Sequence, residues 1–243
     1  MIQVVKSLYS RIKKYIIYVS VTIVILSEYI ELPQYIQTIS VLSLGVMIVE
    51  LLFDINEKVS ASKNRHYYND FYEVSLKMKN LILHEIKSKK KLKIRVLGMS
   101  MGHAWQFLYN TLNPLLTNNN DNCCVVLQIA MLDPNWTDLK EINPYWIDKA
   151  VLNEKIIKQY IQLNQDRIAN KNWEIQLYLY KHMPNWHGIL VGEDYLYLSK
   201  CSWKDNVLQG GESAYEKFDG SVDAYNRLEI SHFINWFDKI SKL

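Results

Sequence analysis

Two glycines flank a serine at Gly98-x-Ser100-x-Gly102, between an apolar run at 92–97 and a helical pattern at 104–116. A Gly-x-Ser-x-Gly turn between a strand and a helix is typical of the nucleophile elbow of serine hydrolases, which exposes the serine hydroxyl at a helix N-terminus. The same kind of turn can bind an anion through backbone N–H groups, or serve only to reverse the chain. The segment therefore indicates nucleophilic chemistry, anion binding or a plain turn.

A serine hydrolase also needs an acid and a base to act with Ser100. Asp133 follows the next apolar run, and His187 or His232 would complete the order Ser, Asp, His. In α/β-hydrolases, however, several strands precede the elbow and one of their loops completes the oxyanion hole. Here the residues before 92 have a helical pattern. We therefore expect binding at this turn, with a serine esterase as the alternative.

A second pattern runs from His187 to Asp194, within a hairpin predicted over 188–191 and 195–199. Its spacing resembles the His-x-Lys-x4-Asp motif of the phospholipase-D-like superfamily, with Ile189 at the Lys position. The resemblance implies a fold in which the histidine attacks phosphorus and the lysine neutralises the phosphate oxygens. Because isoleucine carries no charge, we expect a degenerate, non-catalytic relative, with phosphodiester hydrolysis at His187 as the alternative.

The binding interpretation places an anionic ligand, a nucleotide or an oligonucleotide, at the glycine turn, where backbone N–H groups and a helix N-terminus converge. Nearby lysines can pair with phosphate, and tryptophans can stack on bases. The expected ligand-binding residues are Gly98, Ser100, Gly102, His103, Trp186, His187, Lys89, Lys90 and Lys91. A solvated helix end for the lysines and packing under loops for the tryptophan are the alternatives.

We expect no metal and no other cofactor. The chain has 3 cysteines, an odd number that does not form a disulfide framework and indicates reduced thiols in the cytosol. Cys123 and Cys124 are adjacent on a predicted strand, so their side chains point to opposite faces. The spacing of Cys and His residues predicts no zinc site.

Strands and helices that alternate along the chain position these residues. Strands are predicted at 92–97, 123–132, 173–180 and in the hairpin, and helices at 104–116, 145–169 and 228–240. This order predicts a cytosolic mixed α/β domain at 91–243. A connecting helix and a basic linker are predicted at 54–90.

The amino-terminal part has a different character. The chain has 243 residues, of which 49% are apolar and 22% charged, and its net charge is +3. This composition excludes disordered and low-complexity classes and does not by itself indicate nucleic-acid binding. Within 1–53, however, two nearly uncharged runs predict a transmembrane helical hairpin with spans at about 14–30 and 34–53.

Basic residues flank this hairpin and only acidic residues lie in its turn. The positive-inside rule then predicts a multi-pass protein of the inner membrane with both termini in the cytosol. Glu50 lies at the inner end of the second span, where a carboxylate either lines a pore or lies among the headgroups. A signal peptide and a buried soluble hairpin are the alternatives, although no small-residue cleavage site follows the first run.

A two-span hairpin followed by a cytosolic domain resembles the membrane effectors of bacterial antiphage defence. That resemblance implies a homo-oligomer whose hairpins form a pore or ion channel in the lipid bilayer. A nucleotide or short nucleic-acid signal, made by an enzyme encoded nearby, would control it from the cytosolic domain. The expected function is therefore ligand-gated membrane disruption without catalysis. A membrane-tethered hydrolase acting at Ser100 or His187, and a plain membrane-anchored scaffold, are the alternatives.

Overall fold

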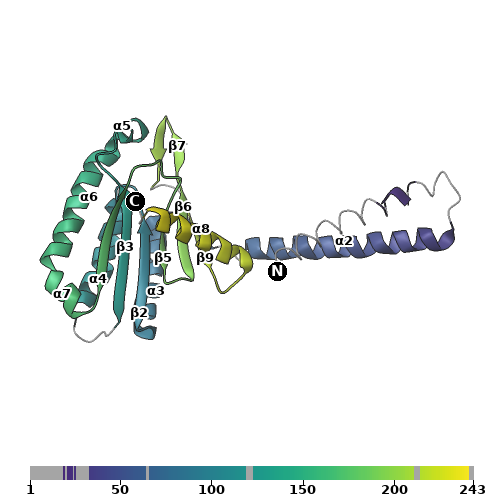
Figure 1. Cartoon of the computed structure of the whole chain (residues 1–243), viewed down its shortest axis with the longest axis horizontal. Helices are drawn as coiled ribbons and strands as arrows, with labels where there is room; N and C mark the ends of the chain where they lie inside the picture. Colours follow the sequence, from purple (N-terminus) through teal and green to yellow (C-terminus); the bar gives the residue numbers. More distant parts are fainter. Residues whose placement is uncertain are drawn as a thin grey trace. The chain divides into compact units, whose positions relative to one another are not determined.

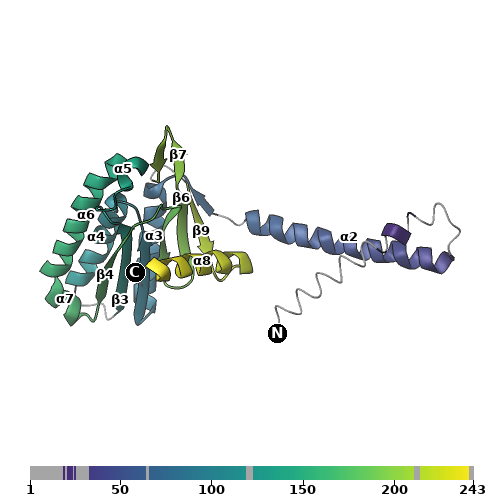
Figure 2. The same ribbon diagram turned by 45° about the horizontal axis from the view of Figure 1, so that its top comes forward.

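A computed structural model describes residues 19, 21–23, 25, 33–63, 66–118, 123–210 and 214–240. The chain divides into two units, Met1–Asn64 and Arg65–Leu243. The second unit contains a seven-stranded mixed sheet with helices on both faces (Figure 1, Figure 2). The predicted mixed α/β domain is therefore confirmed.

The described part of the first unit consists mostly of helix α2, Gln34–Lys63. No helix in the described ranges combines the length and the apolar character needed to cross a membrane. The predicted transmembrane hairpin is therefore wrong, and so is the multi-pass inner-membrane localisation. The span at 14–30 lies mostly outside the described residues, whereas the run at 34–53 lacks charge before Glu50 but contains several Gln, Ser and Thr residues. The sequence also predicted the lipid bilayer as a partner and Glu50 as a pore residue. Both predictions depended on the hairpin, so nothing now supports them.

The sheet has the strand order β1-β9-β6-β5-β2-β3-β4. The strands are β1 His66–Tyr68, β2 Lys91–Leu97, β3 Cys124–Leu132, β4 Glu174–Tyr180, β5 Trp186–Val191, β6 Tyr195–Lys200 and β9 Tyr215–Asp219. β2, β3 and β4 are parallel, whereas β5, β6, β9 and β1 pair antiparallel with their neighbours. A separate hairpin joins β7 Ser202–Lys204 to β8 Val207–Gln209.

Helices cover both faces of this sheet (Figure 1). α3 Phe71–Ser88, α4 Gly102–Thr117, α6 Pro144–Leu163 and α7 Gln165–Asn170 pack on one face, α8 Ala224–Ile240 crosses the other, and α5 Leu139–Ile142 is a single turn. Leu108 and Ile94 belong to the core under α3, α4, α6 and α7, and Phe233, Phe237 and Leu132 belong to the core under α8. Burial on both faces explains why the strands are apolar and rarely alternate.

The α/β unit begins well before residue 91. β1 pairs with β9 at the edge of the sheet, and α3 buries Val74, Met78 and Ile82 completely. The Asp70 carboxylate caps α3 by accepting a hydrogen bond from Glu73 N at 2.8 Å. In place of one connecting helix at 54–86, the chain therefore has the end of α2, an edge strand and a helix that belongs to the core.

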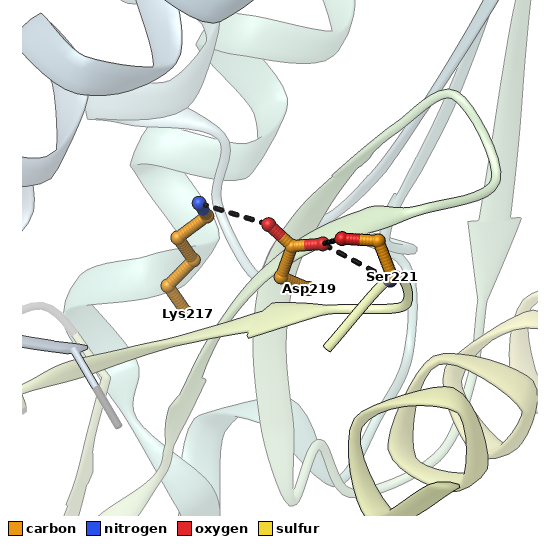
Figure 3. Close-up of polar contacts among 3 residues, drawn as sticks. All are labelled: Lys217, Asp219 and Ser221. Atoms are coloured by element: carbon orange, nitrogen blue, oxygen red, sulfur yellow. Dashed lines mark hydrogen bonds and ion pairs between the residues drawn. The ribbon is translucent and has the colours of Figure 1, made fainter. Parts of the chain in front are cut away.

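A polar turn after β9 leads into α8 (Figure 3). Ser221 donates to Asp219 Oδ1 from its Oγ at 2.6 Å and from its backbone N at 3.1 Å, and Lys217 Nζ lies 3.4 Å from Oδ2. Burial alone raises the pKa of Asp219, but these contacts outweigh it and lower the pKa overall. Asp219 is therefore held in its charged form.

Candidate anion site at the β2–α4 turn

The turn 98–102 forms one wall of a pocket at the carboxyl end of β2. Gly98 N donates to Ala130 O at 2.9 Å, and Leu132 N donates to Met99 O at 3.0 Å, so the turn continues the pairing of β2 with β3. The pocket has a volume of about 290 Å³. Its walls come from α3, the β2–α4 segment, α6, β5, the end of β8 and β9, through Phe71, residues 96–104, Trp146, Lys149, residues 187–189, Gln209, Gly210 and Tyr215.

The amino end of α4 opens to this pocket. Met101, the N-cap residue, has a φ of 61° and provides no side-chain cap. The first intrahelical hydrogen bond runs from Trp105 N to Met101 O at 2.8 Å. The N–H groups of Gly102, His103 and Ala104 precede that bond and have no acceptor within the helix. Together with the helix dipole, they favour a negative charge at this end of the pocket.

His187 lines another wall, because β5 runs antiparallel to β2 with Gly188 opposite Leu97. The His187 side chain is only 7% exposed, and its Nδ1 lies 2.9 Å from the Tyr215 hydroxyl. Its Nε2 is buried and makes no hydrogen bond of normal geometry with the described residues. Burial lowers the pKa of His187 to about 4, and a hydrogen bond to the Gly210 backbone opposes this with a smaller effect. The imidazole is therefore neutral at physiological pH.

A neutral imidazole can either donate a hydrogen bond to an anion or attack phosphorus. The direction of the hydrogen bond between Tyr215 and Nδ1 determines which. Burial raises the pKa of Tyr215, so its hydroxyl stays protonated. If that hydroxyl donates to Nδ1, the His187 Nε2 carries the hydrogen and donates to an anion. If Nδ1 donates to the hydroxyl oxygen instead, Nε2 presents a lone pair, which is the form that attacks phosphorus.

Five of the residues predicted to bind ligand share this pocket: Gly98, Ser100, Gly102, His103 and His187. Ile189, at the position of the motif lysine, also lies in the pocket wall and is 2% exposed. The strand alternation thus places residues 187 and 189 on one face, as the motif requires. The side chain at 189 contributes an apolar surface there and no charge.

The other predicted ligand-binding residues lie elsewhere. The lysines 89–91 precede or begin β2, at the end of that strand opposite to the turn, and β2 spans seven residues, or roughly 20 Å. Lys89 Nζ pairs with Glu85 at 2.5 Å. Trp186 stacks on Trp236, with 5.8 Å between the ring centroids. These side chains do not line the pocket.

The acids and the second base considered for catalysis also lie outside the pocket. Asp133 pairs with Lys181 at 3.5 Å, and Asp194 lies in the turn at the far end of β5 from His187. His232 is half exposed on α8. The described residues that line the pocket include no carboxylate. They therefore do not assemble a Ser–Asp–His triad around Ser100.

Metal-binding chemistry has no site in the described ranges, where no group of three or more His, Cys, Asp or Glu side chains could hold an ion. The three cysteines form no disulfide with one another. Burial raises the pKa of the Cys201 thiol to about 12, so this cysteine is protonated and unreactive.

Several pocket residues were missed by the sequence analysis. Tyr215 reaches His187 only because β9 lies beside β6 in the sheet, an order that no local pattern reveals. Lys149 reaches the pocket from α6. The one sequence signal for it is the spacing of Trp146, Lys149 and Asn153, at intervals of three and four residues that place them on one face of a helix.

Comparisons with known proteins add little. No protein family and no curated protein matches the sequence. Among solved structures, the chain is similar to a phosphatidylserine synthase of Haemophilus influenzae Rd KW20, with 15% identity and a TM-score of 0.40. The match covers 69% of this chain and 36% of the synthase, so this chain spans about a third of that enzyme. A likeness this weak carries no argument about activity, and the predicted resemblance to antiphage effectors has no support from sequence.

Proposed function

We propose that the α/β domain binds a small phosphate-bearing molecule in the pocket between the β2–α4 turn and His187. One observation carries the proposal: the uncapped amino end of α4 and the buried Nε2 of His187, which makes no hydrogen bond of normal geometry with the described residues, belong to the same pocket. The helix end supplies hydrogen-bond donors to an anion, and Nε2 does so when Tyr215 donates to Nδ1. A buried polar atom left unpaired costs stability that a ligand can restore.

The volume of the pocket limits the size of the ligand. Small-molecule sites occupy roughly 300–1,000 Å³, and this pocket, at about 290 Å³, lies at the lower end. We therefore infer a mononucleotide or a smaller phosphate ester and not an oligonucleotide. Control by such a signal, a nearby enzyme that makes it and self-association stay predictions. The membrane-disrupting output is not part of this proposal.

The test is isothermal titration calorimetry of the full chain with inorganic phosphate and AMP at millimolar concentrations. We expect wild-type protein to bind at least one probe and His187→Asn to weaken that binding about tenfold or more, since a hydrogen bond to a charged group is lost. His232→Asn, in an exposed histidine of α8, is the matched control and should bind as wild type does. The absence of binding by wild-type protein, or equal binding by His187→Asn, would contradict the proposal.

A second candidate function is phosphoryl transfer at His187, which the neutral imidazole and its bond to Tyr215 favour. In this reaction, an Nε2–P bond forms as the ester O–P bond breaks, and the released alkoxide takes up a proton from water or, when it is 4-nitrophenolate, leaves as the anion. Bis(4-nitrophenyl) phosphate reports such a step by release of 4-nitrophenolate. A burst in wild-type protein that disappears in His187→Asn would favour transfer, whereas probe binding without any burst would favour a binding site.

A further inference from the structure

One face of α6 lies against the β2–α4 turn. Trp146 and Lys149 on this face line the pocket. Asn153 Nδ2 donates to Ser100 O at 2.9 Å and to Lys149 O at 2.8 Å. The same Nδ2 lies 4.0 Å from the place where a Cβ on Gly102 would be. The Asn153 amide therefore ties the helix turn that carries Lys149 to the backbone of the anion site.

An anion site in this pocket needs a positive charge that the predicted motif does not provide. Ile189 is apolar, and the lysines 89–91 lie at the other end of β2. The neutral His187 adds a hydrogen-bonding atom and no charge. Among the described residues that line the pocket, Lys149 is the one lysine, and arginine, aspartate and glutamate are absent. Lys149 is therefore the one lysine or arginine that brings a positive charge to the described wall, and no described carboxylate in that wall opposes it.

We propose that Lys149 pairs with the phosphate of the ligand and takes the place of the lysine that the motif lacks at position 189. This inference rests on the proposed function, since it names the residue that makes the pocket specific for phosphorylated molecules. Lysine on a helix can serve this purpose because its flexible stem carries a point charge that needs no fixed fork geometry. The Asn153 amide holds the backbone of Lys149 beside the turn.

The test compares Lys149→Gln and Lys149→Arg with Lys155→Gln, a control on the same helix whose exposed lysine does not line the pocket. Inorganic phosphate and AMP are the charged probes, and adenosine is the uncharged one. Lys149→Gln should weaken binding of the charged probes about tenfold or more, and Lys149→Arg should restore most of it. Binding of the charged probes should also depend less on salt concentration in Lys149→Gln than in wild-type protein, because fewer charges take part.

The outcomes separate this inference from the proposed function. If wild-type protein binds phosphate or AMP and Lys149→Gln binds with the same affinity and salt dependence, the role of Lys149 is refuted and the pocket remains an anion site. An equal loss in Lys155→Gln would also refute it, because the effect would then come from overall charge. If wild-type protein binds neither charged probe, both proposals fail. Lys149 is exposed, so its variants should unfold at the wild-type temperature.

Discussion

Acid should destabilise the α/β domain through His187. The pKa of this histidine is about 4 in the folded protein, below its ordinary value of 6.5, because burial disfavours the imidazolium. Between these two values, the unfolded chain binds a proton that the folded chain does not bind. The stability that His187 contributes is therefore fully present above pH 6.5 and is lost as the pH falls toward 4.

The size of this loss follows from the two pKa values. A decrease from 6.5 to about 4 corresponds to about 3 kcal/mol of unfolding free energy, of which about 2 kcal/mol is lost by about pH 5. The assay is urea unfolding of the full chain, followed by tryptophan fluorescence. All 7 tryptophans lie between Trp105 and Trp236, so the signal reports on this domain.

The variant His187→Asn isolates the effect, because asparagine does not titrate. Between about pH 7.5 and about pH 5, the wild type should lose about 2 kcal/mol more than His187→Asn, whatever the stability of the variant at neutral pH. Burial also lowers the pKa of His182, which contributes equally to both proteins. His232→Asn should follow the wild type. Parallel curves for wild type and His187→Asn would refute the reasoning, because they would mean that His187 titrates alike in the folded and unfolded chains.

Three further variants probe the surroundings of the pocket and the sheet, each by urea unfolding. Tyr215→Phe leaves His187 Nδ1 unpaired and should cost about 1–3 kcal/mol; unchanged stability would mean that this hydrogen bond contributes nothing. Gly188→Ala would place a Cβ 2.5 Å from the backbone O of Tyr197 and should cost about 1–3 kcal/mol, so a neutral result would contradict the close approach of β5 and β6. Asp219→Asn should cost about 1 kcal/mol at neutral pH and flatten the stability curve in acid, because the lowered pKa of Asp219 stabilises the fold above its unfolded pKa and this effect disappears as the pH falls through the folded value.

The backbone of the pocket could be predicted from the sequence because local patterns determine it. The apolar run before Gly98 and the helical pattern after Gly102 place the turn at the carboxyl end of a strand, and the structure has β2 and α4 there. His187 directly precedes the hairpin predicted at 188–191 and 195–199, and lies within β5. Its position beside the turn follows once β5 pairs antiparallel with β2, with Leu97 opposite Gly188. Two short patterns therefore located two walls of the pocket, the β2–α4 turn and the start of β5.

The membrane prediction was based on two nearly uncharged runs with basic flanks, and no described helix has the length and apolar character that a span needs. A charge count does not register polar side chains such as Gln34, Gln37 and Thr38 in the run at 34–53. The edge strand β1 was missed for a different reason. It has three residues, too few for any periodicity, and it exists only because β9 provides a partner. A charge count does not measure hydropathy, and a three-residue pattern does not reveal which strand it will pair with.

The lysine missing from the motif shows why spacing alone is a poor test of function. Ile189 lies between Val96 of β2 and Tyr197 of β6 and belongs to the core of the sheet. An apolar residue there stabilises the sheet and leaves the strand without a charge. In our proposal the charge comes instead from an element that packs against the same turn, where Lys149 of α6 lines the pocket. A degenerate strand motif therefore does not determine whether the pocket carries a charge, because a lysine on the neighbouring helix can supply it.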